Sequence, residues 1–345
     1  MVGIPAIITA GDRRAAKGIY GQSKVYLEVA GLPLVARVAL VLQRVPEVSE
    51  VWIVGDAARL EAVFSRQDIH AKLAKPLHIV PQFRNLYENA WETFKRTLPG
   101  AGPEGREPEG ADLDWQTLIL SADMPFATPQ EISEFIRRGW ETGCDYVVGA
   151  VTEESLRAFR PKQQGDMGIE VAYFNTRDGR LRQSNLHLAR PARMGRRHLI
   201  EDMYEYRHQR RFWNMLALGW RVLAVTRGGF AVLFFYGLMH LAGLADRCGL
   251  RALADWIRTY VSLERTEKIL ARMLQTTFRF VTTEVGGCAI DVDDEHEYDV
   301  VRARFEEWSA AQAARAEQLY GPVPLPPVAG TGSSGNGVAS EDGSA

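Results

Sequence analysis

Short apolar runs alternate with amphipathic stretches over the first 150 residues of this 345-residue chain. The apolar runs predict β-strands at 5–9, 50–54, 77–80, 117–120 and 146–150. The amphipathic stretches have helical spacing and predict α-helices at 33–44, 57–66, 86–98 and 129–139. Together they predict an α/β fold in which helices cover a mostly parallel sheet. Such a sheet binds ligands at the carboxyl ends of its strands.

The alternation stops in the second half of the chain. Residues 196–279 are mainly helix-prone and rich in aromatic side chains, which predicts a large helical insertion in a domain formed by 1–195 and 280–320. The Gly-, Pro- and acid-rich residues 99–114 predict a surface loop. Residues 322–345 begin with prolines and end in Gly, Ser and Ala, so they predict a disordered tail.

Charge and cysteine content narrow the partners and surroundings of the protein. It has 41 basic and 43 acidic side chains and a formal net charge of -2, which argues against nucleic acid as a partner. Its three cysteines are widely spaced without a CxxC pair, so neither a disulfide framework nor structural zinc is indicated. The chain enters a strand pattern at Ile4 without the features of a secretory signal. We therefore expect a cytoplasmic protein.

The first predicted strand leads directly into a loop of small and basic residues. The candidate residues are Ala10, Gly11, Asp12, Arg13 and Arg14, followed by Lys24 and by the turn Gly31, Leu32, Pro33 and Leu34. A small-residue turn lets backbone N–H groups approach phosphate oxygens, and arginine and lysine neutralise the charge of a triphosphate. The loop therefore predicts a nucleotide-binding cradle. The alternative is a glycine turn with exposed arginines that binds nothing.

A second candidate motif follows the strand predicted at 117–120. Here Ala122, a further candidate for nucleotide binding, and Asp123 precede Met124 and Pro125, which places the aspartate at the carboxyl edge of the sheet. A carboxylate there is a suitable hard oxygen ligand for Mg²⁺. The alternative interpretation is an aspartate that caps a helix or forms a turn.

A third motif places alternate acids after a short apolar segment near residue 290. Side chains alternate along an extended segment, so Asp291 and Asp293 are expected to point to the same side. One of them can then face Asp123 across a metal ion. The neighbouring Asp294 and Glu295 are better explained as the acidic first turn of a final helix, where the helix dipole favours negative charge.

In this order and at these separations, the three motifs resemble the MobA-like branch of the nucleotidyltransferase superfamily, which includes the molybdenum-cofactor cytidylyl- and guanylyltransferases. The resemblance covers residues 4 to about 150 and about 284 to 305. The family pattern A-G-x-x-x-R, with its later lysine and G-x-P-L turn, matches Ala10, Gly11, Arg14, Lys24, Gly31, Pro33 and Leu34. Its D-M-P triplet matches Asp123, Met124 and Pro125, and its (N/D)-x-(N/D) segment matches Asp291 and Asp293. The chain departs from the family at Asp12, where glycine is common, and at 294–295, where T-P is usual.

The resemblance implies a three-layer, Rossmann-like fold of the GT-A type and a magnesium-dependent nucleotidyltransferase. This enzyme would move a nucleoside monophosphate from a nucleoside triphosphate to a phosphorylated acceptor and release pyrophosphate. Arg14, Lys24 and Asp123 are then the expected catalytic residues, with Asp123, Asp291 and Asp293 as Mg²⁺ ligands. Two other interpretations remain open: a sugar-nucleotide-dependent glycosyltransferase of related fold, and a non-catalytic scaffold that kept the fold.

Polar residues after the third predicted strand are further candidates for nucleotide binding. The amides of Asn85 and Asn89 are placed to contact a base or ribose, although helix capping explains Asn85 equally well. No base preference follows from these residues.

The predicted insertion offers two more expectations. Seven arginines lie between residues 190 and 211 and suit either a phosphate-bearing acceptor or a solvated helical face. Residues 212–245 combine basic, aromatic and apolar positions, which is typical of peripheral contact with the inner face of a membrane. A helical hairpin buried against the protein or a dimer partner is the alternative, and the oligomeric state stays open.

Overall fold

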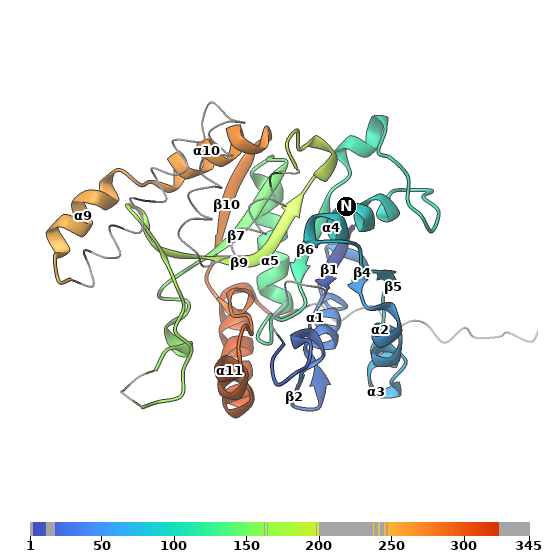
Figure 1. Ribbon diagram of the computed structural model, residues 1–345, viewed down its shortest axis with the longest axis horizontal. Helices are drawn as coiled ribbons and strands as arrows, with labels where there is room; N and C mark the ends of the chain where they lie inside the picture. Colours follow the sequence, from blue (N-terminus) through green and yellow to red (C-terminus); the bar gives the residue numbers. More distant parts are fainter. Residues whose placement is uncertain are drawn as a thin grey trace, which may run out of the picture.

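The computed structural model describes residues 3–11, 18–161, 163, 165–197, 199, 237, 241, 245 and 248–323. Its main sheet has the strand order β10-β7-β9-β6-β1-β4-β5, and β8 pairs with β9 (Figure 1). The strands are β1 (Ile4–Ala10), β4 (Val48–Gly55), β5 (Leu77–Pro81), β6 (Thr117–Ser121), β7 (Tyr146–Thr152), β8 (Phe174–Thr176), β9 (Gly179–Ala189) and β10 (Phe278–Thr283). A separate ribbon consists of β2 (Glu28–Val29) and β3 (Leu32–Pro33).

Most neighbouring strands of the main sheet are parallel. β1 pairs in parallel with β4 and β6, β4 with β5, and β7 with β10. β9 runs antiparallel between β6 and β7. All five strands predicted in the first 150 residues are present, so the predicted α/β fold with a mostly parallel sheet is confirmed. The reversed strand β9 was missing from the prediction, because side-chain alternation indicates a strand but not its direction or neighbours.

The helices agree closely with the predicted segments. They are α1 (Leu34–Leu42), α2 (Ala57–Phe64), α3 (Gln67–His70), α4 (Leu86–Thr97), α5 (Pro129–Glu141), α9 (Arg251–Thr259), α10 (Leu263–Leu274) and α11 (Glu295–Tyr320). Local sequence sets several of their starts. Asp56 caps α2 by accepting a hydrogen bond from the Arg59 N–H at 3.2 Å, and Thr128 caps α5 one residue before Pro129.

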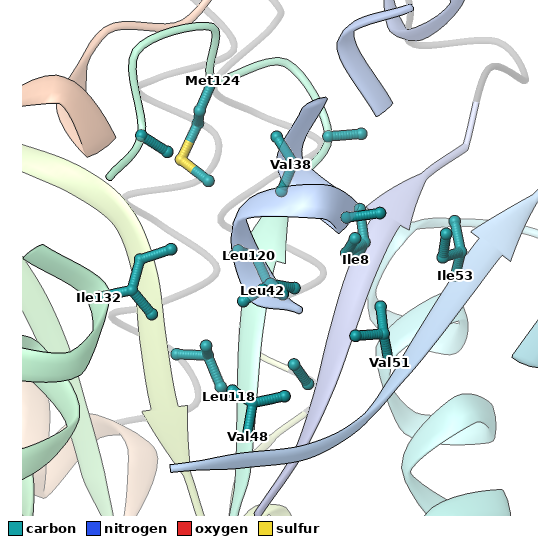
Figure 2. Packing of buried hydrophobic residues seen from close by; sticks show 14 of the residues in the cluster. Ile8, Val38, Leu42, Val48, Val51, Ile53, Leu118, Leu120, Met124 and Ile132 are labelled. Carbon is teal, nitrogen blue, oxygen red and sulfur yellow. The ribbon is translucent and has the colours of Figure 1, made fainter. Parts of the chain in front are cut away.

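Helices cover both faces of the sheet and give it three layers. Successive residues of a strand point to opposite faces, so Ile7 and Ile8 of β1 enter different cores. Ile8 belongs to the core that α1 covers, and Figure 2 shows Val38 and Leu42 of that helix beside it. Ile7 packs on the opposite face with Phe94 of α4 and its neighbours.

The predicted insertion is described only in part. In its second half, α9 and α10 are helical as expected, and α10 contacts β10. β10 begins at Phe278, just before the predicted boundary at 280. Apart from positions 237, 241 and 245, the possible membrane-contact segment 212–245 lies outside the described residues, as do positions 324–345 of the predicted tail. The division into a main domain and an insertion therefore stays a prediction.

Among the described helices, none combines the length and apolar character needed to cross a membrane.

Candidate active site

Three carboxylates from distant parts of the sequence meet at the carboxyl edge of the sheet. Oxygen atoms of Asp123, Asp291 and Asp293 all lie within 4.8 Å of one another. Asp123 follows β6, and the other two follow the short 3-10 helix η5 (Gly287–Ala289) that comes after β10. β9 runs antiparallel to both β6 and β7, and β10 runs parallel to β7, so β6 and β10 run in the same direction and both motifs leave the sheet on the same side. The structure brings together all three residues predicted as metal ligands.

The cluster has the chemistry of a site for a hard divalent cation. Asp123 is buried, Asp291 is partly buried and Asp293 is exposed, so the site has a closed floor and an open side. Carboxylate oxygens are the protein ligands that Mg²⁺ prefers. Like charges at this separation repel each other unless a cation lies among them. The three residues would therefore fit a magnesium ion.

Lys24 supplies a positive charge to this cluster. It begins the 3-10 helix η1 (Lys24–Tyr26), and its Nζ contacts Asp123 Oδ2 and lies 2.7 Å from Asp293 Oδ1. Burial by itself favours the neutral amine, but the charges of Asp123 and Asp293 outweigh it and raise the pKa of Lys24. The side chain therefore stays cationic. The structure places its ammonium on the carboxylates, and the predicted role of Lys24 in holding the triphosphate stays a prediction.

Arg182 was missed by the sequence analysis and contacts the cluster from β9. Its Nη2 lies 2.8 Å from Asp291 Oδ1, and its Nε donates a hydrogen bond to Ala289 O at 2.8 Å. Burial, and then the charges of Asp123 and Asp293, raise the pKa of Asp291, while the guanidinium opposes this shift. The polar and apolar alternation of residues 179–189 was the available signal, because it indicates a strand with Arg182 on one face.

A buried glutamate positions the loop that carries Asp291. The carboxylate of Glu131, in the first turn of α5, accepts hydrogen bonds from Thr283 Oγ1 at 2.9 Å, Gly286 N at 3.0 Å and Cys288 N at 3.1 Å. Burial raises the pKa of Glu131, and these donors oppose that effect. Sequence analysis also missed this residue, since an acid in a first helical turn is already explained by the helix dipole.

Close packing fixes the same loop against the segment after Asp123. A Cβ atom on Gly287 would lie 1.9 Å from the carbonyl oxygen of Phe126, so only glycine fits there. Gly286 has a positive φ of 97°. At the other end of the loop, Asp294 caps α11 by accepting a hydrogen bond from Glu297 N at 2.9 Å, as expected for an acidic first turn. The second and third motifs are thus held together by direct backbone contact.

The first loop is described at its start only. Ala10 ends β1 and Gly11 follows, but Asp12, Arg13 and Arg14 lie outside the described residues. A Cβ on Gly11 would lie 2.8 Å from Asn89 Nδ2, so the glycine allows the backbone to pass the amide. Lys24 comes next in the described part of the motif and, as shown above, reaches the cluster.

The two candidate asparagines have structural partners. Asn85 caps α4, because its Oδ1 accepts a hydrogen bond from Glu88 N at 2.8 Å, which agrees with the capping interpretation. Asn89 is buried, and its Oδ1 accepts a hydrogen bond from Phe83 N at 2.6 Å. Ala122 is fully buried beside Asp123. Their predicted contacts with a nucleotide stay predictions.

The described arginines that begin the 190–211 run lie away from the cluster. Ala189, the last residue of β9, pairs with Thr117 and Tyr146, which begin β6 and β7. Arg190 and Arg193 therefore lie at the amino edge of the sheet, where Arg193 Nη2 is 2.5 Å from Asp114 Oδ1. The two interpretations of the 190–211 run stay open, because most of it lies outside the described residues.

Comparisons with known proteins show similarity to nucleotidyl-transferring proteins. No protein-family model matches the chain. Over 143 residues it is 26% identical to 2-C-methyl-D-erythritol 4-phosphate cytidylyltransferase from Chlorobium luteolum, an alignment that covers 40% of this chain and 55% of that protein. The chain thus spans about half the length of the curated relative it matches.

Solved structures show similarity of fold. A hypothetical transferase from Thermus thermophilus matches with a TM-score of 0.50 and 20% identity, over 86% of this chain and 99% of the other. A 4-diphosphocytidyl-2C-methyl-D-erythritol synthase from Anaerococcus prevotii matches with a TM-score of 0.44 and 14% identity, over 88% of this chain and 96% of the other. Only the first likeness is high enough to support the α/β fold, and neither bears on substrate.

Proposed function

We propose that this chain is a magnesium-dependent nucleotidyltransferase that transfers a nucleoside monophosphate from a nucleoside triphosphate to a phosphorylated small molecule. The observation that carries the proposal is the meeting of Asp123, Asp291 and Asp293 within 4.8 Å, with the ammonium of Lys24 on two of them. This arrangement joins one carboxylate from the middle of the chain to two from its final third. It suits the binding of a cation together with phosphates.

The reaction makes one phosphorus–oxygen bond and breaks another. An oxygen of the acceptor phosphate attacks the α-phosphorus, and the bond from that phosphorus to the oxygen bridging to the β-phosphate breaks. Pyrophosphate leaves with the electron pair. The attacking oxygen is already deprotonated at neutral pH, so no general base is needed. The protein must instead bring two anions together and stabilise the charge that develops on the leaving group.

The residues of the site divide this work. Asp123, Asp291 and Asp293 would hold Mg²⁺, which when bound neutralises phosphate charge and polarises the phosphoryl group. Lys24 keeps its proton and can exchange a carboxylate partner for a phosphate oxygen when substrate arrives. We assign Arg14 and the backbone after Gly11 to the same triphosphate, following the sequence motif. Arg182 holds Asp291 in place.

Sequence similarity supports this proposal and leaves the finer family open. The relative from Chlorobium luteolum is a cytidylyltransferase whose name specifies a phosphorylated acceptor. The three motifs favour the MobA-like branch, which we retain as part of the proposal. Within it, we assign nucleotide binding and catalysis to the domain 1–195 plus 280–320.

The glycosyltransferase alternative has less support from the geometry. A glycosyltransferase of related fold normally carries two aspartates in a D-x-D pair, whereas Ser121 occupies the first of these positions here. The Ser121 hydroxyl donates a hydrogen bond to Asp123 Oδ1, so it orients the aspartate rather than adding a second carboxylate. The additional carboxylates come from the distant third motif.

The direct test is a pyrophosphate-release screen. Purified protein with Mg²⁺ is mixed with each of the four ribonucleoside triphosphates and with phosphorylated sugars, polyols, cofactors and lipids, including 2-C-methyl-D-erythritol 4-phosphate. Acceptor-dependent release of pyrophosphate, lost on removal of Mg²⁺, supports the proposal. If no triphosphate raises the melting temperature in the presence of Mg²⁺, the scaffold alternative is favoured. Hydrolysis of a sugar nucleotide without pyrophosphate release favours the glycosyltransferase.

A further inference from the structure

A cavity lies on the same side of the sheet as the carboxylate cluster. It has a volume of about 420 Å³ and lies between the carboxyl end of β7, the 3-10 helix η3 (Arg157–Phe159) and the turn that joins β8 to β9. Its lining residues are Thr152, Glu153, Glu154, Arg157, Arg160, Asp178, Gly179, Arg180 and Leu181. Most of the lining side chains are therefore polar or charged, with Leu181 as the one large apolar side chain among the described residues.

Charges in this cavity are arranged in pairs. Glu153 Oε1 lies 2.7 Å from Nη1 of both Arg160 and Arg180, and Arg157 Nη2 lies 2.6 Å from Glu154 Oε2. Each guanidinium thus already has a carboxylate partner, so the cavity offers donors and acceptors side by side with little net charge. A body that carries several hydroxyl groups can use both, since each hydroxyl donates and accepts. An acyl chain would cover these charged groups without offering them hydrogen bonds.

The cavity adjoins the cluster through one strand. Arg180 and Arg182 are two residues apart in β9, so they lie on the same face at a spacing of about 7 Å. Arg180 lines the cavity, whereas Arg182 binds Asp291. The ring of Tyr173 lies against Arg180, with the guanidinium carbon 4.9 Å from the ring centre. A molecule in the cavity can therefore extend along β9 to the metal site.

We infer that this cavity receives the polyhydroxylated body of the acceptor, with the acceptor phosphate extending past Arg182 to the carboxylate cluster. The inference rests on the proposed function and narrows the acceptor to a phosphorylated polyol or sugar. Glu153 holds Arg160 and Arg180 in position, and the two arginines donate hydrogen bonds to the hydroxyl groups. A lipid phosphate is disfavoured by the same lining.

Two phosphates that differ in the length of their polyol test the inference. Sorbitol 6-phosphate and glycerol 3-phosphate are titrated into the full chain with Mg²⁺, and binding is followed by saturation-transfer NMR. We expect the wild-type chain to bind sorbitol 6-phosphate at least about tenfold more tightly, because only the longer polyol reaches the cavity, where each charge-assisted hydrogen bond adds roughly that factor. Arg160→Gln and Arg180→Gln should each reduce this preference.

The matched control is Arg66→Gln. Arg66 is likewise held by carboxylates, with Glu28 at 2.7 Å and Asp68 at 3.0 Å, but it does not line the cavity. This variant should keep the preference for sorbitol 6-phosphate, and circular dichroism verifies that all three variants fold. Equal binding of the two probes to the wild-type chain, or a preference unchanged in both cavity variants, overturns the inference.

Kinetics separate this inference from the proposed function. If the pyrophosphate screen finds an acceptor, Arg160→Gln and Arg180→Gln should raise the KM for that acceptor and leave the KM for the triphosphate unchanged. Turnover with both KM values unchanged in both variants removes the cavity from the acceptor site while the proposed function stands. A third outcome is no turnover with any acceptor, while the wild-type chain prefers sorbitol 6-phosphate by NMR and the two cavity variants do not. That outcome supports the polyol phosphate site and contradicts the nucleotidyltransferase activity.

Discussion

Both edges of the sheet carry aspartates beside basic side chains, but the two edges arrange them differently. At the carboxyl edge, three carboxylates crowd within 4.8 Å and share Lys24 and Arg182. At the amino edge, Asp114 is paired with Arg193, and its side chain is 62% exposed, against 3% for Asp123. Exposed pairs of this kind contribute little to stability, whereas buried like charges cost free energy unless a cation compensates them.

The comparison distinguishes an exposed ion pair at the amino edge from a cluster of like charges that the fold holds together at the carboxyl edge. Folding alone gives no reason to place Asp291 next to Asp123, since burial and its acidic neighbours raise the pKa of Asp291 and oppose its ionisation. The loop is nevertheless fastened there by Glu131 and by the fit of Gly287 against Phe126. A structure that is rigid beneath repelling charges is expected of a pre-organised cation site.

Replacing Asp123 should produce the largest loss of turnover, and it is the strictest test of the difference between the two edges of the sheet. Asp123→Asn keeps the shape of the side chain but removes a charge from the cation site, so turnover should fall by roughly 10³-fold. Pyrophosphate release measures this loss, and far-UV circular dichroism should remain that of the wild-type chain. Asp114→Asn, the same change at the amino edge, should retain full turnover. Equal activity of Asp123→Asn and Asp114→Asn would show that the two edges do not differ in function.

The sequence was informative about this edge because the positions of strand ends are local. Asp123 follows an apolar run and could be assigned to the carboxyl edge, and Asp291 and Asp293 follow a short apolar segment that indicates they point to the same side. The capping role of Asp294 was also readable locally. The structure confirms that these motifs meet, and their predicted roles in catalysis are left to the experiments.

What the sequence did not reveal depends on contacts between distant residues. Arg182 reaches Asp291 only because β9 inserts between β6 and β7, a pairing that leaves no trace in the local pattern. Glu131 binds Gly286 N across 155 residues of chain, and no feature of α5 indicates that partner. The same reversal of β9 carries Arg190 to the amino edge, which the charge pattern could not predict.

The close packing of Gly287 against Phe126 predicts the next largest effect. In Gly287→Ala the new methyl group would lie 1.9 Å from the carbonyl oxygen of Phe126, so the loop must move. We expect a loss of about 1–3 kcal/mol in the free energy of unfolding and a reduced turnover, because Asp291 moves with the loop. Chemical denaturation and pyrophosphate release measure the two effects. Gly102→Ala, whose Cβ would meet nothing within 4 Å, is the control and should change neither.

Magnesium itself should stabilise the carboxyl edge. At a concentration ten times its Kd, a ligand that binds only the native state adds about 1.4 kcal/mol, which raises the melting temperature of a protein of this size by about 2 °C. Differential scanning fluorimetry with MgCl2, and with KCl at matched ionic strength, measures the shift. The increase in melting temperature should disappear in Asp291→Asn, because this change removes one negative charge from the carboxylate cluster. A shift that survives in this variant would place the ion elsewhere.

The smallest effect should come from the arginine of the amino edge. Arg193→Gln removes a guanidinium that is 46% exposed, so it should cost at most about 1 kcal/mol of stability and leave turnover unchanged. Arg182→Gln is the same substitution at the carboxyl edge, where the side chain is 20% exposed and binds Asp291. It should lower turnover by about tenfold, because Asp291 then loses the charge-assisted hydrogen bond that orients it. If Arg182→Gln leaves turnover unchanged, as Arg193→Gln should, then Arg182 acts only as a surface charge. The orientation of Asp291 must then come from the loop alone.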